Sequence, residues 1–136
     1  MEGRIVIRSQ LTNLQVIDTI LERIEKEYVL EEDDRFRVRL VLSEAIQNAI
    51  VHGNHSDPDK TVVIDYSKDQ KSDKVFFCIS DQGPGFDLSD VLDPTKPENL
   101  EREGGRGVFF LKQFTEKLAY CNDAKAMKFS VKLRMK

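Results

Sequence analysis

Hydrophobic positions in the first part of the chain change from strand spacing to helix spacing. Residues 3–8 place two isoleucines on one face and predict a short strand. Apolar side chains then recur every three or four positions over residues 11–28, which predicts an amphipathic helix. The charged stretch 31–34 suits the positive N-terminal end of a second helix, which we expect to bury Phe36 and to end near residues 53–54.

The middle of the chain predicts a hairpin followed by a long connection. Residues 61–66 and 75–80 are strand-like and flank a polar turn. Residues 82–104 are rich in proline, glycine and acidic side chains and show no sustained period. So long a stretch without a pattern, in a small domain, is more often a functional lid than a plain connector.

The last part of the chain returns to helical spacing over residues 107–118 and closes with a strand pair, residues 119–121 and 129–133. The predicted order is a strand, two helices, two strands, the lid, a helix and two strands. This order predicts one mixed sheet with helices layered on one face. The length of 136 residues fits a single domain over residues 1–136.

Composition narrows the functional classes. The formal net charge of −3 argues against a nonspecific nucleic-acid binder. Apolar runs are too short to span a bilayer and the N-terminus lacks a signal core, so we expect neither membrane insertion nor secretion. Cys78 and Cys121 are too few for a disulfide framework. We expect both to be small buried side chains in a protein of the reducing cytoplasm.

A polar pair lies on the second predicted helix, in the segment SEAIQNAIVHGN. Glu44 and Asn48 are four residues apart and therefore about 40° apart around a helix, on one face. The amide oxygen can ligate Mg²⁺, and the carboxylate can accept a proton from a hydroxyl or a water held near that cation. Taken alone, such a pair is more often an ordinary solvated helix edge.

The strand-like run 75–79 is followed by the sequence DQGPGF. Gly83 and Gly85 allow a ligand to approach the backbone closely. Asp81 can accept a hydrogen bond from an exocyclic amine, which would select adenine over guanine, because guanine carries a carbonyl oxygen there. The alternative is a plain Asp–Gly turn.

A third cluster, GGRGV, opens the predicted helix 107–118. Gly105 and Gly107 leave backbone N–H groups exposed, and these groups together with the helix dipole favour a phosphate. Arg106 either neutralises phosphate charge or faces water. The alternative for the whole cluster is a flexible hinge before a helix.

Together and in this order, these motifs resemble those of the GHKL (Bergerat-fold) ATPase superfamily. SEAIQNAIVHGN resembles its N box, DQGPGF its first glycine box and GGRGVFF its second. The compact size, the N-box phrase and the lack of a phospho-acceptor helix make the chain most similar to the anti-sigma factor serine kinases. The resemblance implies an α/β (α+β) two-layer sandwich with a mixed, mostly antiparallel sheet. It implies a kinase that uses ATP and Mg²⁺, phosphorylates a serine of a small anti-anti-sigma (STAS-type) partner, otherwise holds a sigma factor, and forms a homodimer.

The resemblance also implies a role for each matching residue. Glu44 corresponds to the general base, Asn48 to the Mg²⁺ ligand and Asp81 to the acid that reads adenine. The glycine boxes supply the remaining nucleotide contacts: Gly83, Gly85, Gly105, Arg106, Gly107 and Val108. His52 either touches the nucleotide or lies on the surface at the helix end. Lys96, in the predicted lid, either reaches a phosphate or is solvated.

One segment departs from the family pattern. The family often has Gly-Thr entering its last strand, with the threonine beside adenine, whereas residues 126–130 of this chain read AMKFS. Ser130 is the candidate replacement for that threonine.

Two functional classes stay open at this point. The first is a serine-protein kinase, and the second is an ATP-gated binding module that sequesters a partner without catalysis. Glu44 favours the kinase, because a pure binder needs Asn48 and Asp81 but no base. Simple ATP hydrolysis differs from the kinase only in whether water or serine meets Glu44.

Overall fold

Helices layered on one face of an antiparallel sheet make up the fold. The computed structural model describes residues 2–69, 72–84, 107–121 and 123–136, with the backbone alone at residues 107–110. The main strands are β1 (Glu2–Arg8), β3 (Thr61–Lys68), β4 (Lys74–Ser80), β5 (Glu116–Cys121) and β6 (Ala126–Lys132). The helices are α1 (Val16–Glu25), α2 (Glu32–Asn48) and α5 (Gly107–Phe114). Shorter elements are the 3₁₀ turn η1 (Leu11–Gln15), the π-helical turn η2 (Ala49–Gly53) and the strands β2 (Tyr28–Val29) and β7 (Arg134–Met135).

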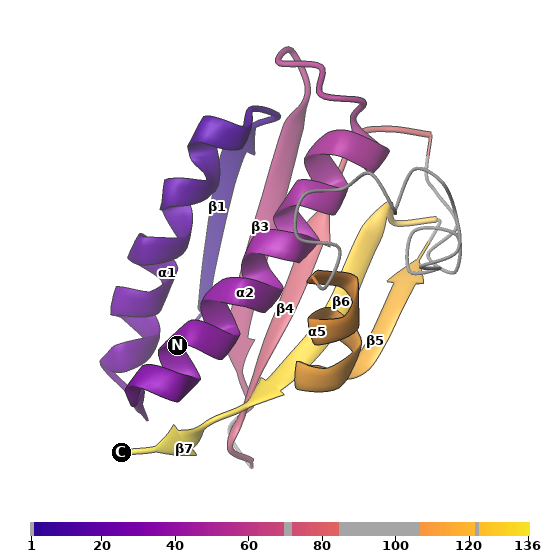
Figure 1. Cartoon of the computed structure of the whole chain (residues 1–136). Helices are drawn as coiled ribbons and strands as arrows, with labels where there is room; N and C mark the ends of the chain where they lie inside the picture. Colours follow the sequence, from indigo (N-terminus) through magenta and orange to yellow (C-terminus); the bar gives the residue numbers. More distant parts are fainter. Residues whose placement is uncertain (1, 70–71, 85–106, 122) are drawn as a thin grey trace.

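The five main strands form one sheet in the order β1-β3-β4-β6-β5, and each neighbouring pair is antiparallel. Figure 1 shows α1, α2 and α5 on one face of this sheet. Strands β2 and β7 pair separately, which brings the C-terminal residues beside the segment between α1 and α2. The predicted two-layer sandwich is confirmed. Each strand pair described is antiparallel, whereas the prediction was a mixed, mostly antiparallel sheet.

The hydrophobic core fills the space between the helices and the sheet. α2 contributes Leu42 and Ile46, which are completely buried. The sheet contributes Phe77 of β4 and Phe129 of β6, whose rings stack with centroids 5.4 Å apart. Burial of each such large apolar side chain contributes roughly 1.5–3 kcal/mol. This packing holds α2, the helix that carries the Glu44–Asn48 pair, against the sheet.

The first two helices differ in detail from the prediction. The predicted helix 11–28 is a 3₁₀ turn followed by α1, and Tyr28 belongs to β2, where its phenol donates to the carbonyl oxygen of Lys74 (3.3 Å). The expectation that Phe36 is buried is wrong, because 64% of this residue is exposed. The buried stripe of α2 passes through Val38, and Phe36 lies about 200° away around the helix.

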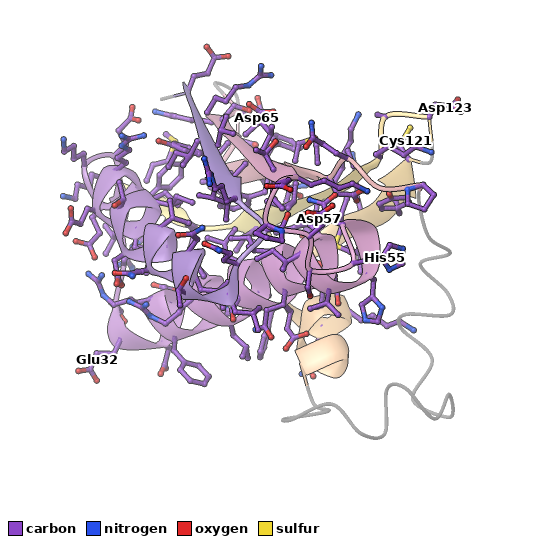
Figure 2. All side chains as sticks on the ribbon, turned by 90° about the horizontal axis from the view of Figure 1, so that it is seen from above. Glu32, His55, Asp57, Asp65, Cys121 and Asp123 are labelled. Atoms are coloured by element: carbon purple, nitrogen blue, oxygen red, sulfur yellow. The ribbon has the colours of Figure 1, made fainter. Side chains whose placement is uncertain are left out.

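The C-terminal segment and the cysteines also differ. The predicted helix 107–118 ends at Phe114, and the next residues form the edge strand β5, which pairs with β6. The expectation that both cysteines are buried is wrong. Cys78 is half-buried, and Cys121 is exposed at the end of β5, near the tip of the β5–β6 connection (Figure 2). Among the helices described, none combines the length and apolar character needed to cross a bilayer.

Candidate functional site

The predicted polar pair lies on the buried side of α2. This helix begins with a capping box, in which the Glu31 and Asp34 side chains satisfy backbone N–H groups of the first turn. One turn apart near its other end, Glu44 is 8% exposed and Asn48 is completely buried. A solvated helix edge is therefore excluded for both residues. Their burial must be explained by what they contact.

Asn48 has no hydrogen-bond partner for either atom of its amide group among the residues described. An unpaired buried amide costs roughly 1–3 kcal/mol relative to a hydrogen-bonded one. A group of this kind in a native structure calls for an explanation, and an ion or a ligand that pairs with it is one. The amide offers one oxygen acceptor and two N–H donors, which suits a hard cation or a phosphate.

The helix does not stop at Asn48 but widens into the π-helical turn η2. The N–H of Asn54 donates to the carbonyl oxygen of Ala49 (2.9 Å), five residues back. Single π-helical turns occur frequently at functional sites. Half-buried His52 lies in this turn, and Gly53 ends it. The end of the helix, predicted near residues 53–54, is confirmed.

Asp81 follows β4 and is almost completely buried, with 7% of its surface exposed. Its backbone N–H donates to the carbonyl oxygen of Lys125 (2.9 Å). Its Oδ1 accepts the N–H of Gly83 (2.9 Å), and its Oδ2 accepts the phenol O–H of Tyr120 (3.1 Å). Two donors from different segments therefore fix the orientation of this carboxylate.

Two glycines allow the end of the helix and the DQGP turn to touch. A Cβ atom at Gly83 would collide with the carbonyl oxygen of Gly53. A Cβ atom at Gly53 would collide in turn with the carboxyl group of Asp81. Here the absence of a side chain, more than backbone freedom, is what the structure requires. The contact places Asp81 directly against the C-terminal end of the helix that carries Glu44 and Asn48.

A second buried amide, which sequence reasoning missed as a site residue, ties this turn to its neighbours. Asn54 accepts the N–H of Gln82 on its Oδ1 (2.7 Å) and donates from Nδ2 to Ser9 Oγ (2.6 Å) and to the carbonyl oxygen of Thr61 (2.9 Å). The Gln82 side chain in turn accepts a hydrogen bond from the backbone N–H of Thr61 (2.7 Å). Asn54 was visible in the sequence as the end of SEAIQNAIVHGN, but two of its three partners, Ser9 and Gln82, are remote in the chain.

Tyr120 is the other residue that sequence reasoning missed. It lies on the edge strand β5, and its phenol reaches Asp81, 39 residues earlier in the chain. Burial, together with the negative charge of Asp81 and the hydrogen bond to it, raises the pKa of the Tyr120 phenol well above its usual range. The sequence signal is no more than an aromatic residue in the short strand of residues 116–121.

Ser130 does not lie beside Asp81, so the expectation that it supplies the family's hydroxyl near adenine is wrong. Ser130 pairs across the sheet with Phe76, and its Oγ donates to the carbonyl oxygen of Glu116 (3.5 Å). Asp81 comes after Ser80, which pairs with Ala126 at the other end of β6. The separation along β6 is four residues, or about 13 Å of extended strand.

Several predicted contacts lie outside the described residues. These are Gly85, Lys96, Gly105 and Arg106, together with the side chain of Val108. Gly107 is described and begins α5. The structure therefore brings together Asp81, Gly83 and the helix end, and places Glu44, Asn48 and His52 along that helix.

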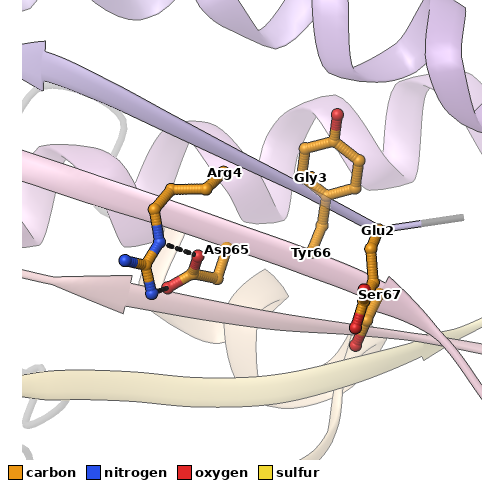
Figure 3. Close-up of a pocket in the computed structure, with 6 residues that line it drawn as sticks. All are labelled: Glu2, Gly3, Arg4, Asp65, Tyr66 and Ser67. Carbon is orange, nitrogen blue, oxygen red and sulfur yellow. Dashed lines mark hydrogen bonds and ion pairs between the residues drawn. The ribbon is translucent and has the colours of Figure 1, made fainter.

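A pocket away from the predicted site residues lies at the far edge of the sheet, between β1 and β3. It has a volume of about 440 Å³ and is lined in part by Gly3, Arg4, Asp65 and Tyr66 (Figure 3). Arg4 and Asp65 form an ion pair there (2.6 Å), so each neutralises the other. None of the predicted site residues lines this pocket. In the described part of the chain, no cluster of three or more His, Cys, Asp or Glu side chains could hold a metal ion.

Comparison with known proteins agrees with this arrangement. A family model described as a histidine kinase-like ATPase domain matches residues 7–135. The chain belongs to this family. The predicted resemblance to the GHKL ATPases is thereby confirmed, and membership implies ATP binding.

Individual relatives in this family carry a more specific name. The chain is similar to an anti-sigma F factor of Halalkalibacterium halodurans, with 35% identity over 116 residues, which cover 66% of this chain and 77% of that protein. It is also similar to an anti-sigma F factor of Clostridium perfringens, with 33% identity over 103 residues, 72% of this chain and 71% of that protein. An anti-sigma F factor of Geobacillus stearothermophilus is 31% identical over 115 residues, 66% of this chain and 77% of that protein.

Proposed function

We propose that this chain is an ATP-dependent serine-protein kinase that acts as an anti-sigma factor. In this proposal it transfers phosphate to a serine of a STAS-type anti-anti-sigma protein and otherwise sequesters a sigma factor. The relatives named anti-sigma F factor support the regulatory role. The observation that carries the enzymatic part is the buried pair on α2, a carboxylate at Glu44 one turn from the Asn48 amide, which has no hydrogen-bond partner among the residues described.

The described residues fit ATP with Mg²⁺. The Asn48 Oδ1 atom is a hard oxygen ligand without a protein partner among the described residues, and so it would suit a magnesium ion. Bound there, Mg²⁺ would supply neutralisation of the charge on the transferred phosphoryl group. Asp81, which two donors hold in place, accepts the exocyclic amine of adenine on its remaining lone pairs.

Glu44 is the proposed general base. Its carboxylate accepts the proton of the serine hydroxyl as that oxygen bonds to phosphorus and ADP leaves. The burial of Glu44 keeps bulk water away from the reacting hydroxyl, which favours transfer to serine over hydrolysis. The fixed helical spacing sets the carboxylate beside the proposed magnesium ligand at Asn48.

The experiment is a transfer assay with labelled ATP, Mg²⁺ and candidate small partner proteins. We expect label on a serine of the partner. Glu44→Gln keeps the shape of the side chain but cannot take the proton, so it should slow transfer by roughly 10²–10⁴ while ATP affinity stays within about tenfold. Glu32→Gln, at the exposed start of the same helix (Figure 2), is the matched control and should transfer at the wild-type rate.

Each other outcome selects a different function. Release of free phosphate without labelled protein would indicate an ATPase. Sigma-factor binding without any turnover would indicate the ATP-gated binding module. Full activity of Glu44→Gln would remove Glu44 as the base. The homodimer and the cytoplasmic location stay predictions, and the mass of the purified protein in solution would test the first of them.

A further inference from the structure

Strand β5 contains a bulge that decides which way Tyr120 points. Glu116 pairs with Ser130, whereas Ala119 pairs with Lys128 and Tyr120 with Met127, so one extra residue is inserted on β5 between these pairs. Lys117, inside the bulge, has a left-handed backbone with φ of 54°. A bulge of this kind re-aims the side chains that follow it.

The consequence follows from the alternation of side chains along a strand. Without the bulge, Glu116 and Tyr120 would face the same side of the sheet, since they are four residues apart. With the bulge, the Glu116 carboxylate forms an ion pair with the Lys74 ammonium on the outer face of the sheet (2.8 Å), while Tyr120 packs against the hydrophobic core. Tyr120 therefore lies on the side of the sheet that the helices cover (Figure 1), where Asp81 is buried. A left-handed lysine costs of order 1–3 kcal/mol, and such strain is often found at functional sites.

The Tyr120 phenol is the second hydrogen-bond donor that the described residues offer to the Asp81 side chain. A carboxylate has about four acceptor lone pairs. The Gly83 N–H takes one on Oδ1, the Tyr120 O–H takes one on Oδ2, and Gly53 packs against the group from the helix side. Without the phenol, the Gly83 N–H would be the only hydrogen bond among those described that fixes the carboxylate, which could then rotate about its terminal bond.

We propose that Tyr120 is a positioning residue that sets the preference for adenine, because its phenol fixes the Asp81 carboxylate with lone pairs aimed at an exocyclic amine. This inference rests on the proposed role of Asp81 as the residue that reads the base. The raised pKa of Tyr120 is consistent with it, since the phenol keeps its proton and remains a donor throughout the neutral range. Tyr120 acts through Asp81 and needs no contact with the reacting phosphate.

The test compares Tyr120→Phe with the wild type on two nucleotides. One is ATP, and the other is purine riboside triphosphate, which carries hydrogen in place of the amine. The substitution removes only the hydroxyl, and the ring still fills its place. Calorimetry should show ATP affinity about tenfold weaker, the scale of one hydrogen bond to a charged group, while the affinity for the amine-free nucleotide changes by less than about twofold.

The matched control is Tyr66→Phe. It removes a phenol that accepts a hydrogen bond from Arg23 (2.6 Å) near the far edge of the sheet, and it should leave both affinities unchanged. An equal loss for both nucleotides in Tyr120→Phe would mean that the phenol only supports the fold, and would overturn the inference. Tighter ATP binding would also overturn it, because the phenol would then compete with the amine.

The design separates this inference from the proposed function. If the wild type prefers ATP to the amine-free nucleotide and Tyr120→Phe keeps that preference, Asp81 reads the base and only the role of Tyr120 fails. If the wild type shows no preference between the two nucleotides, the role of Asp81 fails and the role of Tyr120 fails with it.

Discussion

The Asp81 carboxylate and the Asn48 amide are both buried, yet their hydrogen bonding is opposite. Asp81 receives donors from its own turn and from β5, and a glycine makes room for it at the end of η2. Asn48 lies on a regular helix with neither amide atom paired to any described residue. The proposed base-reading end of the site is therefore assembled by the chain itself. At the proposed phosphate end, no described residue pairs with the Asn48 amide, which leaves it available to a ligand.

This difference in hydrogen bonding means that the two ends of the site contribute differently to the stability of the empty protein. Donors that hold Asp81 contribute to the fold in the absence of nucleotide, so their loss should be felt in the empty protein. The Asn48 amide, which no described residue pairs, opposes folding and is retained at a cost in stability, as polar groups at functional sites often are. Substitutions at the two ends should consequently change stability and nucleotide affinity in different proportions.

Asp81→Asn should have the largest effect. The amide presents N–H₂ to a site where Gly83 and Tyr120 both donate, so at least one donor loses its acceptor. We expect ATP affinity to fall at least about a hundredfold, and the free energy of unfolding without nucleotide to fall by roughly 1–3 kcal/mol. Calorimetry and urea unfolding measure the two quantities.

Asp65→Asn is the control for that substitution. It removes the same charge from an exposed ion pair with Arg4 on the outer face of the sheet, which contributes little. Unchanged ATP affinity in Asp81→Asn would reject both the adenine role and the contrast between the two ends.

Gly83→Ala sharpens the comparison through the backbone. The added methyl group meets the carbonyl oxygen of Gly53, and neither main chain can move aside without displacing Asp81. We expect a loss of roughly 1–3 kcal/mol in the free energy of unfolding, from overpacking. Gly53→Ala should cost a similar amount, and the double variant should cost less than the sum, since both disrupt one contact. Additive losses would show that the two glycines act independently.

The fold follows from the sequence wherever the hydrophobic period is local and regular. The hairpin predicted for residues 61–66 and 75–80 is confirmed as β3 and β4, because inward and outward positions alternate along both strands. Phe36 shows where this reasoning fails. An apolar residue on a helix was expected to join the core, but the helix places it outside the stripe that Val38 and its successors bury.

The candidate site was partly visible in the same way. Motif spacing identified Glu44, Asn48 and Asp81, but whether the Asn48 amide finds a partner depends on the whole fold. Tyr120 could not be found from local pattern, because its direction depends on the bulge at Lys117, and Glu116 and Tyr120 would otherwise share a face. The Asn54 side chain bonds to Ser9 directly after β1, to Thr61 at the start of β3 and to Gln82 after β4, and the first and last of these are remote in the chain.

Asn48→Ala should show the pattern opposite to that of Asp81→Asn. Removing an amide that no described residue pairs relieves a desolvation cost and leaves a small cavity, so the free energy of unfolding without nucleotide should change by less than about 1 kcal/mol. The gain in ATP affinity on adding Mg²⁺ should shrink by about tenfold, because the proposed cation ligand is gone. Titrations with and without Mg²⁺ give this ratio.

Gln47→Ala is the control on the same helix, since it removes an amide that is paired with Ser43 (2.8 Å). It should leave the Mg²⁺ effect intact. A large loss of stability in Asn48→Ala would mean that the amide supports the empty fold, and the distinction between the two ends would disappear.

The smallest expected effect is the dependence of stability on alkaline pH. The pKa of Tyr120 is raised in the folded protein by burial and by Asp81, whereas the unfolded phenol has its ordinary pKa of about 10. As pH rises past that value, the unfolded chain loses the proton first, so this contribution to stability is full below pH about 10 and is lost as pH rises further. The free energy of unfolding should therefore fall more steeply above pH about 10 in the wild type than in Tyr120→Phe. The pKa of Tyr28 is also raised, but Tyr28 is present in both proteins, so the difference between the two curves isolates Tyr120. Parallel curves would mean that folding does not hold the phenol's proton, and that the base-reading end is less completely assembled than its hydrogen bonds indicate.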